Sequence, residues 1–235
     1  MSNGKAPKYN VRHAQIRPRL KGDWDGEDWQ NVEELTVAHF LPAGSDHRPL
    51  AQAKLLYGDR QVYGIFRVGD RYVRCTHTEY LSNVYEDACV EFFVQPRAGM
   101  GYFNFEMNCG GAMLASYIED PTRIHDPERP NDEFAKFTRL PAEWAAQVRL
   151  YHSLPETVEP EIADPITWTV EFHIPLELFE AYVGPLGDLP GQTWHANFNK
   201  CAETNSHPHW ATWAPIGDKL DFHQPDRFAP IHFVA

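Results

Sequence analysis

Residues 86–96 read EDACVEFFVQP, a run in which two sets of side chains alternate until a proline ends it. Successive side chains of a β-strand point to opposite faces of its sheet. One face would hold Ala88, Val90, Phe92 and Val94, and the other would hold Cys89, Glu91, Phe93 and Gln95. The segment therefore predicts a central strand with one face packed in a core and the other face available for chemistry.

Three further segments alternate in the same way. Residues 102–109 follow a glycine-containing turn and are predicted to form a hairpin with residues 86–96, and the pattern recurs at residues 167–174 and 194–199. Their polar positions include Asn104, Glu106, Asn108, Glu171, His173, Asn197 and Asn199. If these strands share a sheet, the sheet presents a surface of amides, carboxylates and imidazoles.

The rest of the chain consists mostly of short strand patterns and turn signals. Residues 51–68 predict a second hairpin around Gly58, residues 147–151 predict a strand, and Leu176–Tyr182 after Pro175 predicts the one short helix. Residues 117–144 and 155–165 are expected to be long loops, and residues 1–19 a loose segment with an edge strand at 11–16 at most. The predicted fold is all-β, an antiparallel, jelly-roll-like β-sandwich formed as one domain by residues 20–235.

Composition narrows the class of partner. The 235 residues include 21 Lys and Arg against 33 Asp and Glu, a formal net charge of −12, with no basic run and no glycine-rich phosphate loop. Nucleic acid and anionic membranes are therefore unfavoured partners. No apolar run approaches the roughly 18 to 20 residues of a spanning helix, and residues 1–5 lack the apolar core of a signal peptide. A cytoplasmic protein is expected as the sequence is written, or a secreted or periplasmic one if an export signal was removed.

The cysteines and one tryptophan are assigned to packing. Cys75, Cys89, Cys109 and Cys201 show no C-x-x-C spacing and lie in or beside predicted strands. We therefore expect buried, reduced thiols and neither a disulfide framework nor a zinc site. Trp29 is expected to be a core plug.

A saccharide site is the hypothesis that best uses the polar strand positions. Sugars present vicinal hydroxyls and a weakly apolar ring face, so they need amides and carboxylates beside flat aromatic rings. The candidate residues are Glu91, Glu106, Asn108, Asn197 and Asn199 for the hydroxyls, and Tyr85, Trp210 and Trp213 for the ring. The alternative is a merely solvated sheet face, but asparagine is depleted in strands, so its repetition there favours a ligand.

Several motifs together resemble the stand-alone relatives of the family 9 carbohydrate-binding modules. They are DWDG at 23–26 with Trp29, EDACVEFFV at 86–94, WTVEFHIP at 168–175, NFNK at 197–200, WAP at 213–215 and the closing FHQPDRF at 222–228. The resemblance implies a β-sandwich that binds mono- or oligosaccharides without a required catalytic step, between two tryptophan walls. It makes Trp213 one wall, offers Tyr80 and Tyr85 where the other tryptophan is expected, and allows calcium in loops without assigning ligands.

Two alternatives to non-catalytic sugar binding stay open. Glu91, Glu106 and Glu171 could supply the carboxylate pair of a glycoside hydrolase, which needs about 5 to 9.5 Å between the two acids. A structural interaction domain is the third possibility. The histidines His207, His209, His223 and His232 match no zinc spacing, and Met107 falls on the apolar face, against haem ligation. We therefore expect no cofactor, with calcium allowed by the resemblance alone.

Overall fold

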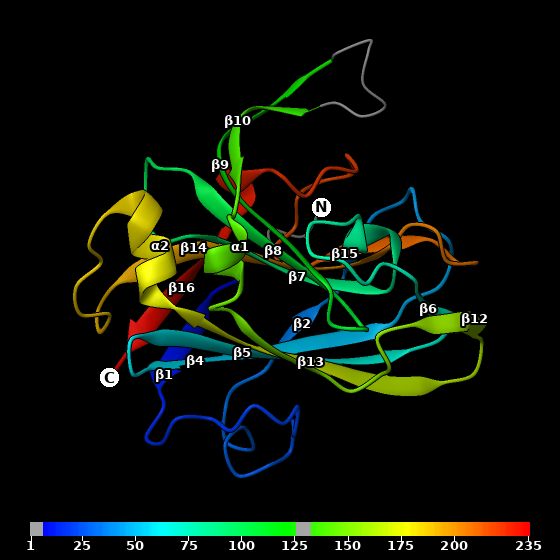
Figure 1. Ribbon diagram of the computed structural model, residues 1–235, viewed down its shortest axis with the longest axis horizontal. Coiled ribbons are helices and arrows are strands. Elements are labelled where there is room, and N and C mark those ends of the chain that lie inside the picture. The colour runs from blue at the N-terminus through cyan, green and yellow to red at the C-terminus, as the bar shows by residue number, and fades with distance from the viewer. Residues whose placement is uncertain (1–6, 126–132) are drawn as a thin grey trace.

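The computed structural model describes residues 7–125 and 133–235 of the chain, and its strands form two packed layers (Figure 1). The first layer contains β7 (Cys89–Gln95), β8 (Tyr102–Asn108), β9 (Met113–Ile124), β10 (Glu133–Arg139), β14 (Thr193–Ala202) and β15 (His209–Thr212). The second contains β4 (Leu50–Gly58), β5 (Gln61–Asp70), β13 (Ile166–Pro175) and β11 (Arg149–His152), with β2 (Leu35–Val37) at its edge. The shorter strands are β1 (Tyr9–His13), β3 (His39–Phe40), β6 (Val73–Cys75), β12 (Val158–Ile162) and β16 (Ala229–Val234).

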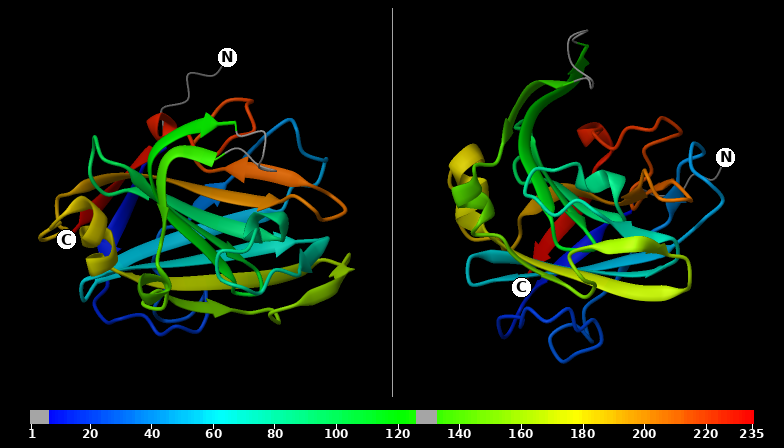
Figure 2. Two further views of the ribbon diagram at one scale, coloured as in Figure 1. Left: turned by 45° about the horizontal axis from the view of Figure 1, so that its top comes forward. Right: turned by 45° about the vertical axis from the view of Figure 1, so that its right-hand side comes forward.

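Hydrogen bonding connects the two layers into one folded path. The strand order is β10-β9-β8-β7-β14-β16-β1-β4-β5-β13-β11, and β1 lies parallel to both of its neighbours, whereas the other pairs are antiparallel. The path bends back on itself, so that β7 and β14 face β5 and β13 across the core (Figure 2). Phe92 of β7 stacks on Phe172 of β13 with 5.4 Å between ring centroids, and Phe66 of β5 lies 6.0 Å from Phe198 of β14. The predicted all-β sandwich is confirmed.

The segment EDACVEFFVQP forms β7 near the centre of the first layer, as its alternation predicts. Val90, Phe92 and Val94 are fully buried between the layers. The opposite face is buried too, because Cys89 and Phe93 belong to a separate apolar cluster on the outer side of the layer. A second set of side chains therefore covers the outer face of β7, and this is where a pocket forms.

The outer face of the second layer is closed by the N-terminal segment. Trp29 is 1% exposed, and the Lys54 ammonium donates to the backbone carbonyls of Trp24 and Trp29 at 3.1 and 2.9 Å. Glu171 accepts hydrogen bonds from the backbone N–H groups of residues 21–22 and from the Trp29 indole N–H. Trp29 is therefore the predicted plug, and Glu171 holds this segment in place on the layer opposite the polar face of β7.

Several segments expected to be irregular form strands. The 117–144 stretch contains the outer half of β9, then β10 and the short helix α1 (Ala142–Ala145), and residues 155–165 contain β12, which pairs with β6. Strand β10 is exposed or half-buried along its whole length, so it carries no apolar alternation to reveal it. Residues 1–19 contain β1, which is hydrogen-bonded between β16 and β4 and buries Tyr9 and Val11. The helix predicted after Pro175 is confirmed as α2 (Leu176–Val183), and none of the described helices is long and apolar enough to cross a membrane.

A buried ionic network lies inside one end of the sandwich. The Lys200 ammonium is 3.5 Å from an Asp70 carboxylate oxygen and 2.9 Å from Nε2 of His209. Burial alone would raise the pKa of Asp70, but the Lys200 charge and a hydrogen bond from His47 outweigh it and hold that pKa well below its usual range. Burial and the Lys200 charge lower the pKa of His209 to about 3, so that this imidazole is neutral.

All four cysteines are buried free thiols. We predict that freshly purified protein, unfolded in denaturant, will titrate with four thiols per chain, because no cysteine is paired in the fold. A disulfide-specific reductant added before unfolding serves as the control and should not raise that value. Fewer than four thiols without the reductant would contradict the prediction.

Candidate functional site

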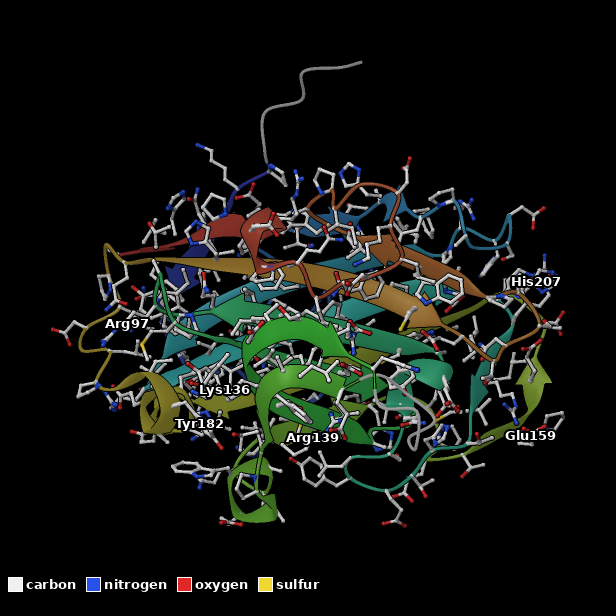
Figure 3. All side chains as sticks on the ribbon, turned by 90° about the horizontal axis from the view of Figure 1, so that it is seen from above. Arg97, Lys136, Arg139, Glu159, Tyr182 and His207 are labelled. Atoms are coloured by element: carbon white, nitrogen blue, oxygen red, sulfur yellow. The ribbon has the colours of Figure 1, made fainter. Side chains whose placement is uncertain are left out.

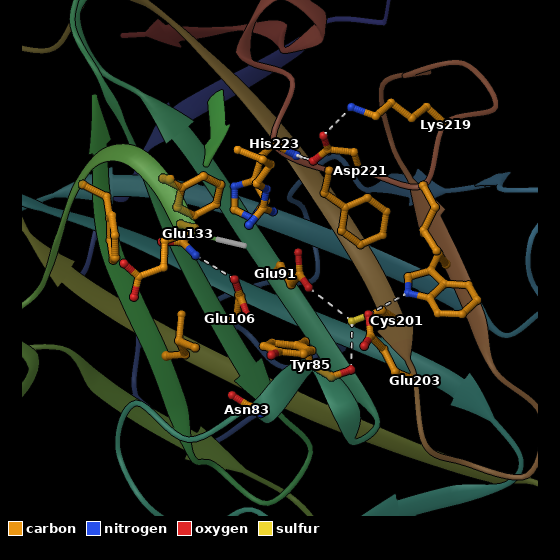
Figure 4. A pocket seen from close by; sticks show the side chains of 18 of the residues that line it. Asn83, Tyr85, Glu91, Glu106, Glu133, Cys201, Glu203, Lys219, Asp221 and His223 are labelled. Atoms are coloured by element: carbon orange, nitrogen blue, oxygen red, sulfur yellow. Dashed lines mark hydrogen bonds and ion pairs between the residues drawn. The ribbon is translucent and has the colours of Figure 1, made fainter. Parts of the chain in front are cut away.

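A pocket of about 1140 Å³ opens on the outer face of the first layer. Its floor is made by β7, β8 and β14, one wall by the hairpin arm of β9 and β10, and the other by β15 and residues 219–223 (Figures 3 and 4). Four of the predicted site residues line it, namely Tyr85, Glu91, Glu106 and Trp210. The polar faces of the strands thus form the floor of a walled cavity.

Strand register places the polar floor residues in rows. Asn199 of β14 is paired with Glu91 of β7, which is paired in turn with Glu106 of β8. The Asn199 amide donates to one Glu91 oxygen at 3.1 Å, and the Asn104 amide donates to one Glu106 oxygen at 2.6 Å. Two further oxygens on this floor, Asn104 Oδ1 and Glu106 Oε2, are buried without a hydrogen-bond partner in the described part of the chain, and so is Asn199 Oδ1 beneath the floor. Unpaired buried polar atoms are costly, so they indicate a surface adapted to a polar ligand.

Burial also controls the charge of the floor. Burial raises the pKa of Glu106 well above its usual range, and the neighbouring Glu91 raises it further. The pKa of Glu91 is raised by burial to about 7, although the hydrogen bond from Asn199 opposes this. Both shifts favour the protonated form of the carboxyl groups, and a carboxylic acid can donate a hydrogen bond as well as accept one.

Aromatic side chains line the rim of this polar floor. Trp210 lies on β15 opposite Cys201, is partly exposed, and donates its indole N–H to Glu203 at 3.1 Å. Tyr85 lies near the floor in Figure 4, and Phe134 and Phe137 contribute from β10. The pocket therefore combines flat apolar surfaces with amides and carboxyl groups.

The remaining predicted residues occupy other places or other roles. Asn199 lies under the floor beside Glu91. Asn197 uses its amide on both backbone groups of Ala214, and Asn108 donates to Asp87 at 2.9 Å and to the His77 carbonyl. The protein satisfies both amides and neither residue lines the pocket, so their contacts in this fold are structural.

Trp213 is a core residue and not a rim residue. It is 6% exposed and packs edge-on against Phe198, with 5.6 Å between the ring centroids. Its backbone N–H donates to the Phe198 carbonyl, which turns the chain inward directly after β15 ends at Thr212. The expectation that Trp213 stacks on a ligand is therefore corrected, and Trp210 is the tryptophan that lines the pocket.

The sequence patterns missed part of the lining. Asn104 belongs to the alternation of residues 102–109 and could have been included on that basis. Glu203, Phe134, Phe137 and His223 come from loops and from the arm, where no periodicity marks them. Burial, followed by the Arg123 charge, lowers the pKa of His223 to about 3, so this wall residue is neutral and bonds the Tyr102 hydroxyl through Nδ1.

The four histidines considered as metal ligands do not form one cluster: His207 and His209 lie near each other beside His47, while His223 and His232 lie elsewhere. His209 contacts Lys200, His207 stacks on Tyr72, His223 contacts Tyr102, and His232 contacts Thr193. Within residues 7–125 and 133–235, no group of three or more potential metal-binding side chains includes a histidine.

The sequence model of carbohydrate-binding family 9 matches residues 27–233, most of the chain. The chain belongs to carbohydrate-binding family 9. No curated protein matches this family 9 chain in a sequence search. The family assignment confirms the resemblance carried by the EDACVEFFV, WTVEFHIP and NFNK motifs.

Solved structures share the fold of this family 9 chain. A protein from Bacteroides uniformis ATCC 8492, described as a candidate carbohydrate-binding protein, has a TM-score of 0.81 at 24% identity and covers 97% of this chain and 100% of its own. A family 9 module from Caldicellulosiruptor kristjanssonii in complex with cellotriose has a TM-score of 0.62 at 14% identity, covering 97% and 94%. The same source provides a complex with glucose, with a TM-score of 0.60 at 13% identity, covering 95% of each chain. At these identities the likeness establishes the fold.

Proposed function

We propose that the pocket on the outer face of the first layer binds a neutral mono- or oligosaccharide without changing it chemically. The observation that carries the proposal is the set of buried oxygens without protein partners on a floor walled by aromatic rings. Family 9 membership and the sugar complexes of proteins with the same fold support it. Every contact with the sugar in this site comes from this chain's own residues.

The polar and the aromatic residues of the pocket match different parts of a sugar. Glu106, whose raised pKa favours the protonated form, can donate to a hydroxyl oxygen, while Asn104 Oδ1 can accept from a hydroxyl hydrogen. Trp210 and Tyr85 offer flat surfaces to the C–H face of the ring. Glu91 positions the Asn199 amide by accepting its N–H at 3.1 Å.

We predict that Trp210→Ala will weaken saccharide binding by about 1 to 3 kcal/mol, because it removes one apolar wall. The measurement is calorimetry of the full chain against glucose, xylose, galactose and cello-oligosaccharides, for which the unmodified protein should bind one sugar with Kd of roughly 1 mM to 1 μM. Added salt should barely change the affinity of a neutral ligand. The matched control is Trp144→Ala on α1, a partly buried tryptophan outside the pocket, which should leave affinity unchanged.

Other outcomes of that titration would count against the proposal. Equal losses in Trp210→Ala and Trp144→Ala would show that the effect is not local to the pocket. A strongly salt-dependent affinity would indicate an anionic partner. If none of the neutral sugars binds the unmodified protein, and Trp210→Ala is as stable as the unmodified protein, the ligand belongs to a class other than neutral saccharides.

Glycoside hydrolysis is a second candidate, favoured by one observation. Glu91 and Glu106 are directly opposite on neighbouring strands and both line the pocket. Opposite residues have Cβ atoms about 4.5 to 5.5 Å apart, and retaining glycosidases hold their carboxyl groups about 5 to 5.5 Å apart. Product analysis of each sugar that binds separates the two functions: new reducing ends that disappear in Glu106→Gln would establish hydrolysis.

A further inference from the structure

Two thiols and a carboxylate converge under the pocket. Cys89 of β7 and Cys201 of β14 are cross-strand partners, and Glu91 follows two residues after Cys89 on the same face. One donor atom from each of the three residues lies within 4.8 Å of the other two, and all three residues are buried. Among the described residues this is the one group of three or more such side chains.

We propose that Cys89, Glu91 and Cys201 bind a thiolate-preferring d¹⁰ cation, with Zn²⁺ as the physiological type. Zinc–sulfur bonds of about 2.3 Å and zinc–oxygen bonds of about 2.0 to 2.2 Å in tetrahedral geometry place the ligand atoms roughly 3.5 to 3.8 Å apart. The Cys201 thiol already lies 3.2 Å from Glu91 Oε1, and every separation within the group is at most 4.8 Å. Side-chain adjustments of about 1 Å at most therefore suffice to surround an ion.

The donor set selects the class of metal. Calcium and magnesium prefer all-oxygen shells, whereas thiolates favour zinc and other soft cations. Two thiolates and one carboxylate give three protein ligands, which is the number that zinc sites with an open fourth position use. Glu91 and Cys201 line the pocket, so the fourth position faces the cavity and is open to water.

Neighbouring side chains hold the Glu91 carboxylate in an orientation suited to binding a metal ion. Asn199 donates to the second oxygen of Glu91 at 3.1 Å, which fixes the carboxylate and leaves Oε1 directed at Cys201. Such hydrogen bonds to metal-binding carboxylates orient them and strengthen binding. Glu203 adds a further carboxyl group to the same pocket.

Simple packing explains the thiols less well. The other two buried cysteines, Cys75 and Cys109, also interact with each other, but no carboxylate joins them in a three-residue group among the described residues. This pair of buried thiols therefore lacks the third donor that Glu91 provides to Cys89 and Cys201. The two pairs therefore form an internal comparison.

Zinc binding to the intact chain tests the proposal directly. Full-length protein without an affinity tag, treated with a chelator and kept in a non-thiol reductant, is titrated with Zn²⁺ and then freed of unbound metal. We expect one zinc per chain by elemental analysis. Cys89→Ser, Cys201→Ser and Glu91→Gln should each weaken the affinity, the serine variants by about 100-fold or more, while Cys109→Ser should bind like the unmodified protein.

A second measurement identifies the ligand atoms and does not depend on the variants folding. Cd²⁺ bound to the unmodified protein should show the ultraviolet thiolate charge-transfer band with the intensity of two thiolates per ion. No stoichiometric metal, a band of fewer than two thiolates, or equal losses in Cys109→Ser and Cys201→Ser would overturn the proposal. No sugar is present in these titrations, so their outcome is separate from that of the proposed function.

Discussion

Trp213→Ala is expected to lower the free energy of unfolding by about 3 to 5 kcal/mol, the range measured for large aromatic residues removed from cores. The indole is 6% exposed and packs against Phe198 in the core between the layers. Removing it leaves a cavity beside Phe198 in the core, and the lost contacts and the cavity both lower stability. Urea unfolding of the full chain measures the loss.

Trp210 is the matched control, because it lies three residues earlier and on the pocket face. Trp210→Ala should cost clearly less stability than Trp213→Ala, since its side chain is partly exposed. The two variants should therefore separate: Trp210→Ala weakens sugar binding, and Trp213→Ala weakens the fold. A stable Trp213→Ala variant that has lost sugar binding would instead return Trp213 to the pocket wall.

The alternation of side chains along β15 explains why Trp210 was placed correctly from the sequence and Trp213 was not. On β15, Trp210 opposes Cys201 and Thr212 opposes Asn199, so alternate residues share the pocket face. Trp213 comes three residues after Trp210, and this odd spacing puts it on the opposite face, in the core with Ala211, where its backbone N–H donates to the Phe198 carbonyl. The type of residue correctly indicated an aromatic surface, but its position in the alternation decides on which face it lies.

The polar floor of the pocket was partly predictable from the sequence, again because side chains alternate along strands. Period-two alternation in residues 86–96 and 102–109 placed Glu91 and Glu106 on one face, and register then made them neighbours. Alternation could not distinguish Asn199, which keeps an unpaired oxygen, from Asn197, whose amide bonds Ala214. That difference comes from Ala214, which lies 17 residues from Asn197 along the chain. The β10 residue Phe134 is still more distant in sequence from the strands of the floor.

Some segments that form strands were predicted to be irregular, because their exposed side chains show no apolar alternation. Strand β10 has no buried side, and its pairing with β9 rests on backbone hydrogen bonds and contacts such as the 2.7 Å ion pair between Lys136 and Glu119. Strand β1 has only five residues, yet it joins the two halves of the strand path through parallel pairs with β16 and β4. Short strands whose partners are distant in sequence carry little local signal.

Asp70→Asn is expected to lower the free energy of unfolding by about 3 to 5 kcal/mol, because it leaves the fully buried Lys200 ammonium without a counter-charge. The two groups are 3.5 Å apart, with side-chain exposures of 0% for Lys200 and 1% for Asp70. Asp70 also accepts hydrogen bonds from the Trp168 indole at 3.3 Å and the backbone N–H of Arg71 at 2.8 Å. The double variant Asp70→Asn with Lys200→Met removes both charges and should recover part of the loss, which urea unfolding of the cycle measures.

The exposed pair of Lys219 and Asp221 provides the control for this prediction. Their 3.0 Å contact involves a lysine side chain that is 75% exposed, so Lys219→Ala should change stability by about 0 to 1 kcal/mol.

Acid adds an independent check on Asp70. Its pKa is lowered in the folded protein, so its contribution is fully present above the unfolded pKa of about 3.9 and is lost as the pH falls below that value. The stability difference between the unmodified protein and Asp70→Asn should therefore be constant near neutral pH and shrink in acid. A difference that stays constant down to pH values well below 3.9 would contradict the charged form of Asp70 in this network.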